Sequence, residues 1–161
     1  MTESTSCIII GAGPKLGIAL AKRFAIAGYD VAVASRNPEK LNTTIETIRK
    51  ETSSSLKAYA CDGINEAQVA DLFNTVEEEL SPCEIAIYNA STRFRKPIAE
   101  TSVDEISHSW RVLCLGGFIL GREAAKRMQK RNKGSILFTG ATASVKGYAH
   151  SATFAIGKFG L

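Results

Sequence analysis

The sequence of 161 residues predicts an α/β protein with one parallel sheet that is covered by helices on both faces. Five short apolar runs alternate with segments of helical periodicity. The runs are apolar at consecutive positions, which is typical of strands in a sheet buried on both faces. A glycine-rich turn follows the first run, and a helical pattern begins directly after it. Together these features predict a doubly wound parallel sheet, the Rossmann fold, formed as a single domain over residues 1–161.

The first half of the chain contains three of the predicted strands. In order, we expect a strand at 6–11, a helix at 14–27, a strand at 30–35, a helix from 38 to about 50, and a strand at 56–61. Gly28 is a plausible stop for the first helix, and Asn37-Pro38 reads as the start of the second. The side of the first helix expected to be buried contains Leu16, Ala19, Leu20, Phe24 and Ile26.

The second half contains the longest predicted helix. We expect a helix from Asn65 to about 80, a strand at 83–88, a helix from Ser102 to about 131, a strand at 135–139, and the start of a last helix. Capping boxes mark Asn65 and Ser102. The apolar line expected along the long helix is Ile106, Trp110, Leu113, Leu120, Ala124 and Met128. Gly116, Gly117 and Gly121 each cost about 1 kcal/mol of helix stability relative to alanine, which indicates close approach of another helix or a cofactor.

Composition limits the class of protein. Hydrophobic residues make up 45% of the chain, charged residues 22%, and the net charge is +4, as in an ordinary globular protein. No apolar run is long enough to cross a membrane, and the N-terminus has no basic segment typical of a secretory signal, so we expect a cytoplasmic protein. The four scattered cysteines have no metal-like spacing and are expected to be free thiols. The densest basic cluster, 126–133, lacks interleaved aromatic residues, so nucleic acid is not an expected partner.

The glycine turn is the first candidate site. Its spacing, Gly11-x-Gly13-x-x-x-Gly17, suits a phosphate held by backbone amides and a helix N-terminus. It has one more residue between the last two glycines than the common dinucleotide fingerprint. A tight turn without a ligand therefore remains an alternative.

The end of the second strand suggests which dinucleotide the turn binds. A site selective for NAD needs an acidic residue there, whereas this chain has Ser35-Arg36. An arginine suits a 2′-phosphate, and Lys15 in the turn adds a second cation. We therefore predict NADP(H) in preference to NAD(H). The alternative is that Arg36 is a solvated charge.

The chain resembles the short-chain dehydrogenase/reductase family over essentially its whole length. The matching segments are the Gly11–Gly17 turn, Asp62, Asn89-Ala90, the helix through Trp110 and 115–118, the strand from Gly134, and Lys158. The resemblance implies that Asp62 bonds the adenine and that Asn89 and Ala90 lie along the ribose, although Asp62 is also a possible cap and Asn89 a turn former. The predicted cofactor-binding residues are Gly11, Gly13, Lys15, Leu16, Gly17, Ser35, Arg36, Asp62, Gly63, Asn89, Ala90, Ser91 and Lys158.

The resemblance also indicates a changed active site. Family enzymes move a hydride between nicotinamide and a carbonyl or alcohol, using a tyrosine, a lysine, a serine and an asparagine. Lys158 matches the lysine, but the other three positions fall on Phe154, Ala141 and Cys114. A phenyl ring has no proton to donate.

Two functions stay open at this point. The first is an NADP(H)-dependent oxidoreductase in which Thr142 donates a hydrogen bond in place of the serine and Tyr148 or His150 carries the proton, or which reduces an acceptor such as an activated alkene or iminium. The second is a catalytically reduced NADP(H)-binding module with a structural or sensing role. Lys158 is expected to hold the nicotinamide ribose in either case, unless it is a surface lysine.

The resemblance implies two further expectations. Family members pack their long helix and the following helix against partner subunits, so we expect a homodimer or homotetramer. They also continue for two more strands and a substrate-covering loop beyond the segment that ends here at Leu161. We therefore expect the natural protein to be longer, because an open apolar sheet edge favours aggregation.

Overall fold

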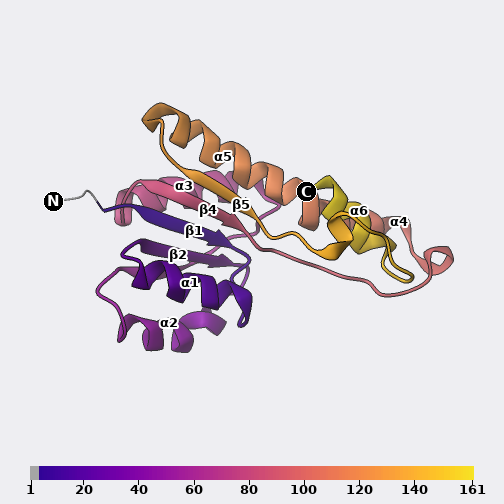
Figure 1. Ribbon diagram of the computed structural model, residues 1–161, viewed down its shortest axis with the longest axis horizontal. Helices are drawn as coiled ribbons and strands as arrows, with labels where there is room; N and C mark the ends of the chain where they lie inside the picture. The colour runs from indigo at the N-terminus through magenta and orange to yellow at the C-terminus, as the bar shows by residue number, and fades with distance from the viewer. Residues whose placement is uncertain (1–3) are drawn as a thin grey trace.

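The computed structural model describes residues 4–161, which form one five-stranded parallel sheet between two layers of helices (Figure 1). The strand order is β3-β2-β1-β4-β5, so the chain winds outward from β1 in both directions, as predicted. All four strand pairs are parallel. The strands are β1 Ser6–Ile10, β2 Asp30–Ser35, β3 Leu56–Ala60, β4 Cys83–Tyr88 and β5 Ser135–Phe138.

The helices cover both faces of this sheet. α1 and α2 pack on one face, α3 and α5 on the other, and α4 and α6 pack together beyond the carboxyl ends of the strands (Figure 1). The α-helices are α1 Leu16–Ile26, α2 Asn42–Arg49, α3 Glu66–Glu79, α4 Val103–Trp110, α5 Gly116–Arg131 and α6 Ala152–Gly160. Short helical turns lie at η1 Pro38–Leu41, η2 Ile98–Glu100, η3 Arg111–Leu115 and η4 Thr142–Ser144.

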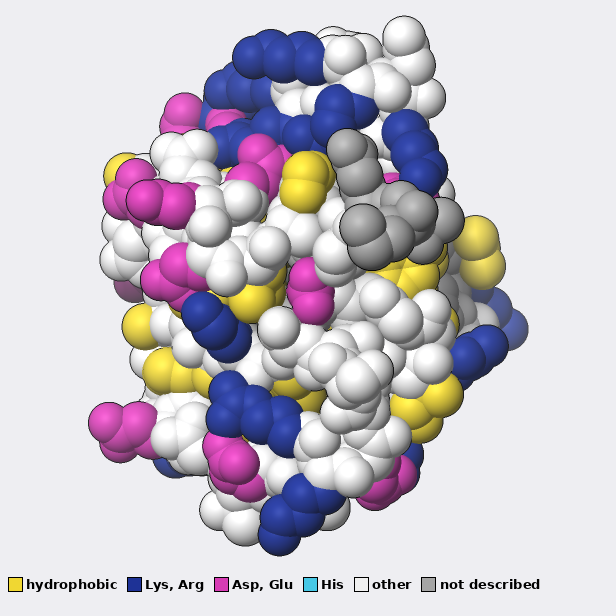
Figure 2. Space-filling model, turned by 90° about the vertical axis from the view of Figure 1, so that its left-hand side faces the viewer, with side chains coloured by type: hydrophobic (Ala, Val, Ile, Leu, Met, Phe, Trp, Pro, Cys, Tyr) yellow, Lys and Arg dark blue, Asp and Glu magenta, His cyan; other side chains and the backbone are white. Residues whose placement is uncertain are grey.

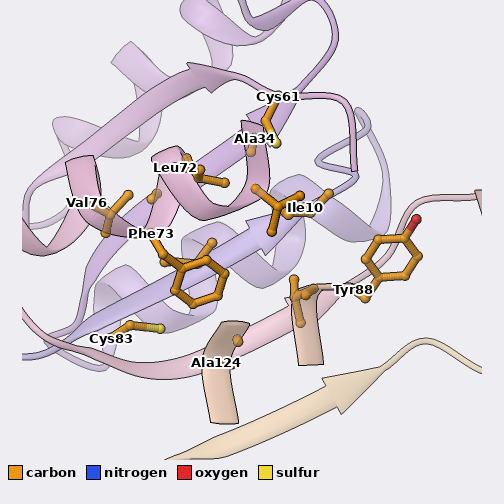
Figure 3. Close-up of a cluster of buried hydrophobic side chains, with 14 of the residues drawn as sticks. Ile10, Ala34, Cys61, Leu72, Phe73, Val76, Cys83, Tyr88 and Ala124 are labelled. Atoms are coloured by element: carbon orange, nitrogen blue, oxygen red, sulfur yellow. The ribbon is translucent and has the colours of Figure 1, made fainter. Parts of the chain in front are cut away.

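The sheet divides the core into two halves, and β1, its central strand, contributes side chains to both. Ile8 and Ile10 point into the half under α3 and α5, shown in Figure 3, whereas Cys7 and Ile9 point into the half under α1 and α2. All four of these side chains are at most 1% exposed. This alternation explains why the strand is apolar at four consecutive positions, 7–10.

The predicted face of α1 is partly wrong. Leu16 and Ile26 are 49% and 53% exposed, and Ala19 is also exposed. The buried side contains the small residues Gly17, Ala21 and Ala25 together with Ile18. Small side chains allow this helix to lie close to the sheet, so its packing face differs from the face with the largest apolar residues.

The predicted long helix is interrupted. A π-helical turn, η3, separates α4 from α5. A π-helical turn contains one more residue than an α-helical turn, and this extra residue shifts the apolar line along the helix. Trp110, which was predicted to lie on the apolar line, is 42% exposed. The mid-helix glycines are approached by side chains rather than by a helix backbone. A Cβ atom would overlap the Tyr88 hydroxyl at Gly116 and the Leu161 side chain at Gly117, and would lie 3.1 Å from the Phe138 ring at Gly121.

The helix ends confirm some predicted caps and correct others. Gly28 has φ +93° and follows α1, and Ser102 forms the predicted reciprocal capping box with Glu105. Asn65 accepts the amide of Gln68, but the Gln68 side chain accepts the amide of Asp62 instead of returning to the cap. Asn37 makes no side-chain cap bond to η1.

The surface bears on several sequence predictions. The basic cluster 126–133 pairs with acidic residues, as in the contacts of Arg127 and Arg131 with Glu77, and Figure 2 shows acidic side chains among the basic ones.

Cys7, Cys61 and Cys83 are buried free thiols, and Cys114 is a partly exposed one. No helix within residues 4–161 is both long and apolar enough to span a membrane. At the β5 edge of the sheet, Leu137 and Phe138 are each 43% exposed.

Candidate cofactor-binding and active site

A groove of about 630 Å³ lies where β1, β2, β3 and β4 end, at the point where the strand order reverses. Every predicted cofactor-binding residue except Lys158 lines it. The lining residues are Ile10, Gly11, Ala12, Gly13, Pro14, Lys15, Leu16, Gly17, Ser35, Arg36, Cys61, Asp62, Gly63, Ile64, Tyr88, Asn89, Ala90, Ser91, His108 and Val112. The structure thus brings together residues from five separate parts of the sequence, 10–17, 35–36, 61–64, 88–91 and 108–112.

The glycine turn packs tightly on two sides and is open on the third. Gly11 has φ +90°, and a Cβ atom there would overlap the backbone of Ala90. A Cβ atom on Gly17 would lie 2.6 Å from the Cα of Ala12. At Gly13, by contrast, a Cβ atom would meet nothing within 4 Å. The turn therefore has room for a phosphate on the side of Gly13.

Hydrogen bonds tie the glycine turn to the neighbouring strands. The amide of Gly11 donates to the Ala34 carbonyl at 3.0 Å, and the Asn89 side chain donates to the Gly11 carbonyl at 2.9 Å. The amide of Asn89 donates to Ile10 at 2.8 Å. Asn89 therefore holds the end of β4 against the end of β1, which is a more specific role than that of a turn former.

The N-terminus of α1 is prepared for an anion. Lys15 precedes this helix with φ −105°, so its backbone keeps the negative φ expected of a non-glycine residue. It makes no side-chain cap bond, and the first turn contains no acidic residue. The first amides of α1 and the positive end of its dipole thus face the groove without a competing carboxylate.

The end of β2 contributes an unsatisfied hydroxyl and a cation. The Ser35 Oγ is buried and has no hydrogen-bond partner within residues 4–161. Arg36 is exposed and makes no ion pair with the described residues. Asp62, which follows the neighbouring strand β3, also lines the groove, and its Oδ1 accepts the amide of Ile64 at 3.3 Å in a local turn. Asn65, rather than Asp62, caps α3.

Lys158 lies outside this groove lining and is 4% exposed. Its Nζ donates to the Thr139 carbonyl at 2.5 Å, and burial lowers its pKa from the ordinary value. Phe154 lies one turn earlier, with its ring centroid 5.9 Å from the Lys158 ammonium and 5.2 Å from the Arg93 guanidinium. The ring thus contacts two cations and supplies no acid. The neighbouring Thr153 hydroxyl donates to Phe94 and ties α6 to the loop that carries Arg93.

The other residues considered for chemistry do not gather at the groove. Thr142, Tyr148 and His150 are exposed in the segment after β5, and the Lys146 ammonium lies 5.8 Å from the Tyr148 ring. Ala141 donates its amide to Ser144 Oγ. Cys114 lines a separate apolar hollow of about 490 Å³ together with Trp110, Leu115, Phe118, Phe138, Gly160 and Leu161.

The lining residues that sequence reasoning did not predict include Tyr88, His108 and Val112. Tyr88 ends β4 and is 1% exposed, and His108 and Val112 reach the groove from α4 and η3. The His108 ring packs edge to face against Phe94, with centroids 6.1 Å apart. The apolar run of β4 indicated that Tyr88 is buried. The regular α-helical period predicted for the helix from Ser102 did not indicate that His108 and Val112 face the groove.

Comparison with known proteins places this geometry in a family. The model of the short chain dehydrogenase family matches residues 5–161. A short-chain dehydrogenase from Rhodopseudomonas palustris superposes with a TM-score of 0.91 at 36% identity, over 97% of this chain and 73% of that one.

Curated relatives with named activities are more distant. The 2,3-dihydro-2,3-dihydroxybenzoate dehydrogenase of Bacillus subtilis is 28% identical over 96% of this chain and 61% of its own length. The chlorophyll(ide) b reductase NOL of Arabidopsis thaliana is 28% identical over 86% of this chain and 40% of its own length. The chain thus spans less than two thirds of the length of each of these two relatives. On the match of the family model and the geometry of the groove, the chain belongs to the short-chain dehydrogenase family.

Proposed function

We propose that this chain is an NADP(H)-dependent oxidoreductase that acts on a small carbonyl or alcohol substrate. The observation that carries the cofactor preference is the pairing of Ser35 and Arg36 at the end of β2. Within residues 4–161, the buried Ser35 hydroxyl has no hydrogen-bond partner and the Arg36 guanidinium has no acidic side chain paired with it. Both groups suit a phosphate on the ribose. An acidic residue, which would bond the free ribose hydroxyls of NAD(H), is missing at this strand end.

The remaining groove residues fit the rest of the dinucleotide. The open side of the turn at Gly13 and the N-terminus of α1 would hold the pyrophosphate, with the Lys15 ammonium beside it. Asp62 and Gly63 would line the adenine, and Asn89, Ala90 and Ser91 the ribose. Lys158 would hold the nicotinamide ribose with the two N–H donors that it does not use on Thr139.

The chemistry proposed for this site is hydride transfer. Bound NADPH supplies a hydride to an electrophilic carbon of the substrate. The protein holds the reactants in place and keeps the Lys158 cation near Phe154. Since Phe154 and Ala141 supply no proton, we propose that the proton comes from another side chain or from water. A catalytically reduced NADP(H)-binding module is the alternative that activity measurements would reveal.

The proposal also covers the oligomeric state of the protein and its location in the cell. Exposed Phe118 and Trp110 border the apolar hollow next to the end of α6, and a second copy of the chain is the partner we propose there, in a homodimer or homotetramer. The buried free cysteines suit a reducing compartment, and the cytoplasm is part of the proposal.

Titration of NADPH and NADH fluorescence tests the cofactor preference. We expect NADPH to bind at least about 10-fold more tightly, and Arg36→Ala to remove most of that difference, because a hydrogen bond to a charged group contributes about 1.5–3 kcal/mol. Lys40→Ala removes an exposed cation four residues later and is the matched control. Equal affinities in the wild type would contradict the NADP(H) preference.

Hydride transfer needs a separate assay. We expect NADPH to be consumed in the presence of at least one member of a panel of carbonyls and activated alkenes. Binding of NADPH without turnover on the whole panel, combined with carbonyl reduction by Phe154→Tyr plus Ala141→Ser, would instead support the catalytically reduced module.

A further inference from the structure

The π-helical turn η3 frees a backbone carbonyl beside the groove. In a continuous α-helix the amide of Gly116 would donate to the Val112 carbonyl, four residues earlier. Here it donates to the Arg111 carbonyl, five residues earlier. The Val112 carbonyl accepts the Tyr88 hydroxyl at 2.6 Å instead. A side chain from β4 thus replaces the donor that the helix has displaced.

Two glycines make the space that Tyr88 occupies. A Cβ atom on Gly116 would overlap the Tyr88 hydroxyl, and a Cβ atom on Gly63 would lie 3.2 Å from its ring and 2.9 Å from Ile10. In Figure 3, Tyr88 lies at one end of the core cluster, with its hydroxyl pointing away from Phe73. Burial raises the pKa of Tyr88, so the hydroxyl stays protonated and remains a donor.

The extra residue in η3 decides which side chains reach the groove. Before it, His108 and Val112 line the groove, and after it, Leu120 and Ala124 are buried against the sheet. Each residue of an α-helix advances by about 100°, so losing the extra residue would rotate α4 by about that angle relative to α5. α5 is held by the core, so the residues of α4 would move away from the groove.

We propose that Tyr88 is a positioning residue of the cofactor groove. Its hydroxyl holds the π-helical turn at Val112, and the turn keeps His108 and Val112 in the wall of the groove. Tyr88 also contacts Gly63, so one side chain sets the separation between the loop after β3 and the α4 wall. The inference rests on the proposed function, because it assumes that this groove binds NADP(H).

Tyr88→Phe tests the role of the hydroxyl with little change in shape. We expect the Kd for NADPH, measured by fluorescence titration, to rise about 3- to 10-fold, which corresponds to the loss of one hydrogen bond. Without cofactor, hydrogen exchange of the amides of 111–117 should be faster than in the wild type.

Two controls separate positioning from a general loss of stability. Tyr59→Phe removes a hydroxyl that bonds Glu79 at 3.0 Å on β3, outside the groove lining. Ile87→Val removes one methylene group from the opposite half of the core, and its unfolding temperature shows how far a stability loss alone affects binding. Both controls should keep the wild-type Kd and the wild-type exchange at 111–117.

Each outcome decides the role of Tyr88. If Tyr88→Phe keeps the wild-type Kd while the wild type binds NADPH, the positioning role is overturned, whatever happens to exchange. An unchanged exchange at 111–117 likewise overturns it, because the hydroxyl would then not hold the turn. If the wild type binds neither NADPH nor NADH, the proposed function fails first, and the role of Tyr88 in cofactor binding falls with it.

Discussion

Lys158 is buried as a cation, and within residues 4–161 no carboxylate lies within 4 Å of its ammonium. Among the residues the structure describes, its one hydrogen-bond partner is a backbone carbonyl, so the charge is held at a net cost in stability. A group that lowers stability without a packing benefit is typical of a site kept for function. This is the residue-scale argument for a ribose-binding role.

Lys158→Met should therefore stabilise the apo protein and weaken cofactor binding. The pKa of Lys158 is lower in the folded than in the unfolded protein, so the destabilisation is fully present below the folded pKa. It disappears as pH rises through the folded pKa toward the ordinary value of 10.5. At neutral pH we expect a gain of about 1 kcal/mol, or about 2–4 °C in unfolding temperature.

Thermal unfolding at neutral pH and near pH 10 checks this sign. The advantage of the variant should shrink at the higher pH, and its Kd for NADPH should exceed that of the wild type at neutral pH. A variant less stable than the wild type at neutral pH would show that the ammonium is better satisfied than its contacts suggest.

At the scale of the element, the turn between β1 and α1 is defined by what surrounds each glycine. Gly17 lies against the backbone of Ala12, and Gly11 against that of Ala90, whereas Gly13 faces open space. The spacing of the three glycines did not distinguish these roles, because the neighbours of Gly11 come from the segment that follows β4. The turn therefore combines two structural glycines with one whose side faces the groove.

Gly17→Ala and Gly13→Ala should separate those roles. A Cβ atom on Gly17 meets backbone that cannot move easily, so we expect a loss of about 1–3 kcal/mol in the free energy of unfolding and weaker NADPH binding. Gly13→Ala should leave the unfolding temperature nearly unchanged but weaken NADPH binding, because its methyl group enters the groove. Chemical denaturation and fluorescence titration of both variants measure this, and equal stability of the two would contradict it.

At the scale of the whole molecule, large apolar side chains remain exposed on α4, α5 and α6. Trp110, Phe118, Ile156 and Phe159 are each more than two fifths exposed, and Phe118 borders the apolar hollow beside the end of α6. Several such side chains near one end of a molecule are more than scattered exposure explains. This is the physical basis for the proposed self-association.

Phe118→Asp should lower the oligomeric state of the full-length protein. A buried carboxylate at an apolar contact between copies is strongly unfavourable, so the mass measured by light scattering should fall toward that of one chain. Ile98→Asp, at an apolar side chain that is 74% exposed on η2, should leave the mass unchanged. A wild-type mass equal to one chain would contradict self-association altogether.

Most of the fold could be predicted from the sequence, since strands and helices follow from local patterns. The five strands lie within a residue of their predicted positions, and the lining of the groove contains twelve residues that the glycine spacing, the end of β2 and the family resemblance indicated. The replacements at Phe154 and Ala141 follow from the family resemblance and stay predictions, as does the occurrence of hydride transfer.

What the sequence by itself determined is the alternation of strands and helices, the glycine turn and the residues at the ends of β1, β2 and β4. Only the tertiary structure decided the π-helical turn at Arg111–Leu115 and the reach of His108 into the groove. The physical reason is that α- and π-helical turns differ by one residue and little local energy. The choice between them depends on Tyr88, which arrives from another element and supplies the Val112 carbonyl with a donor.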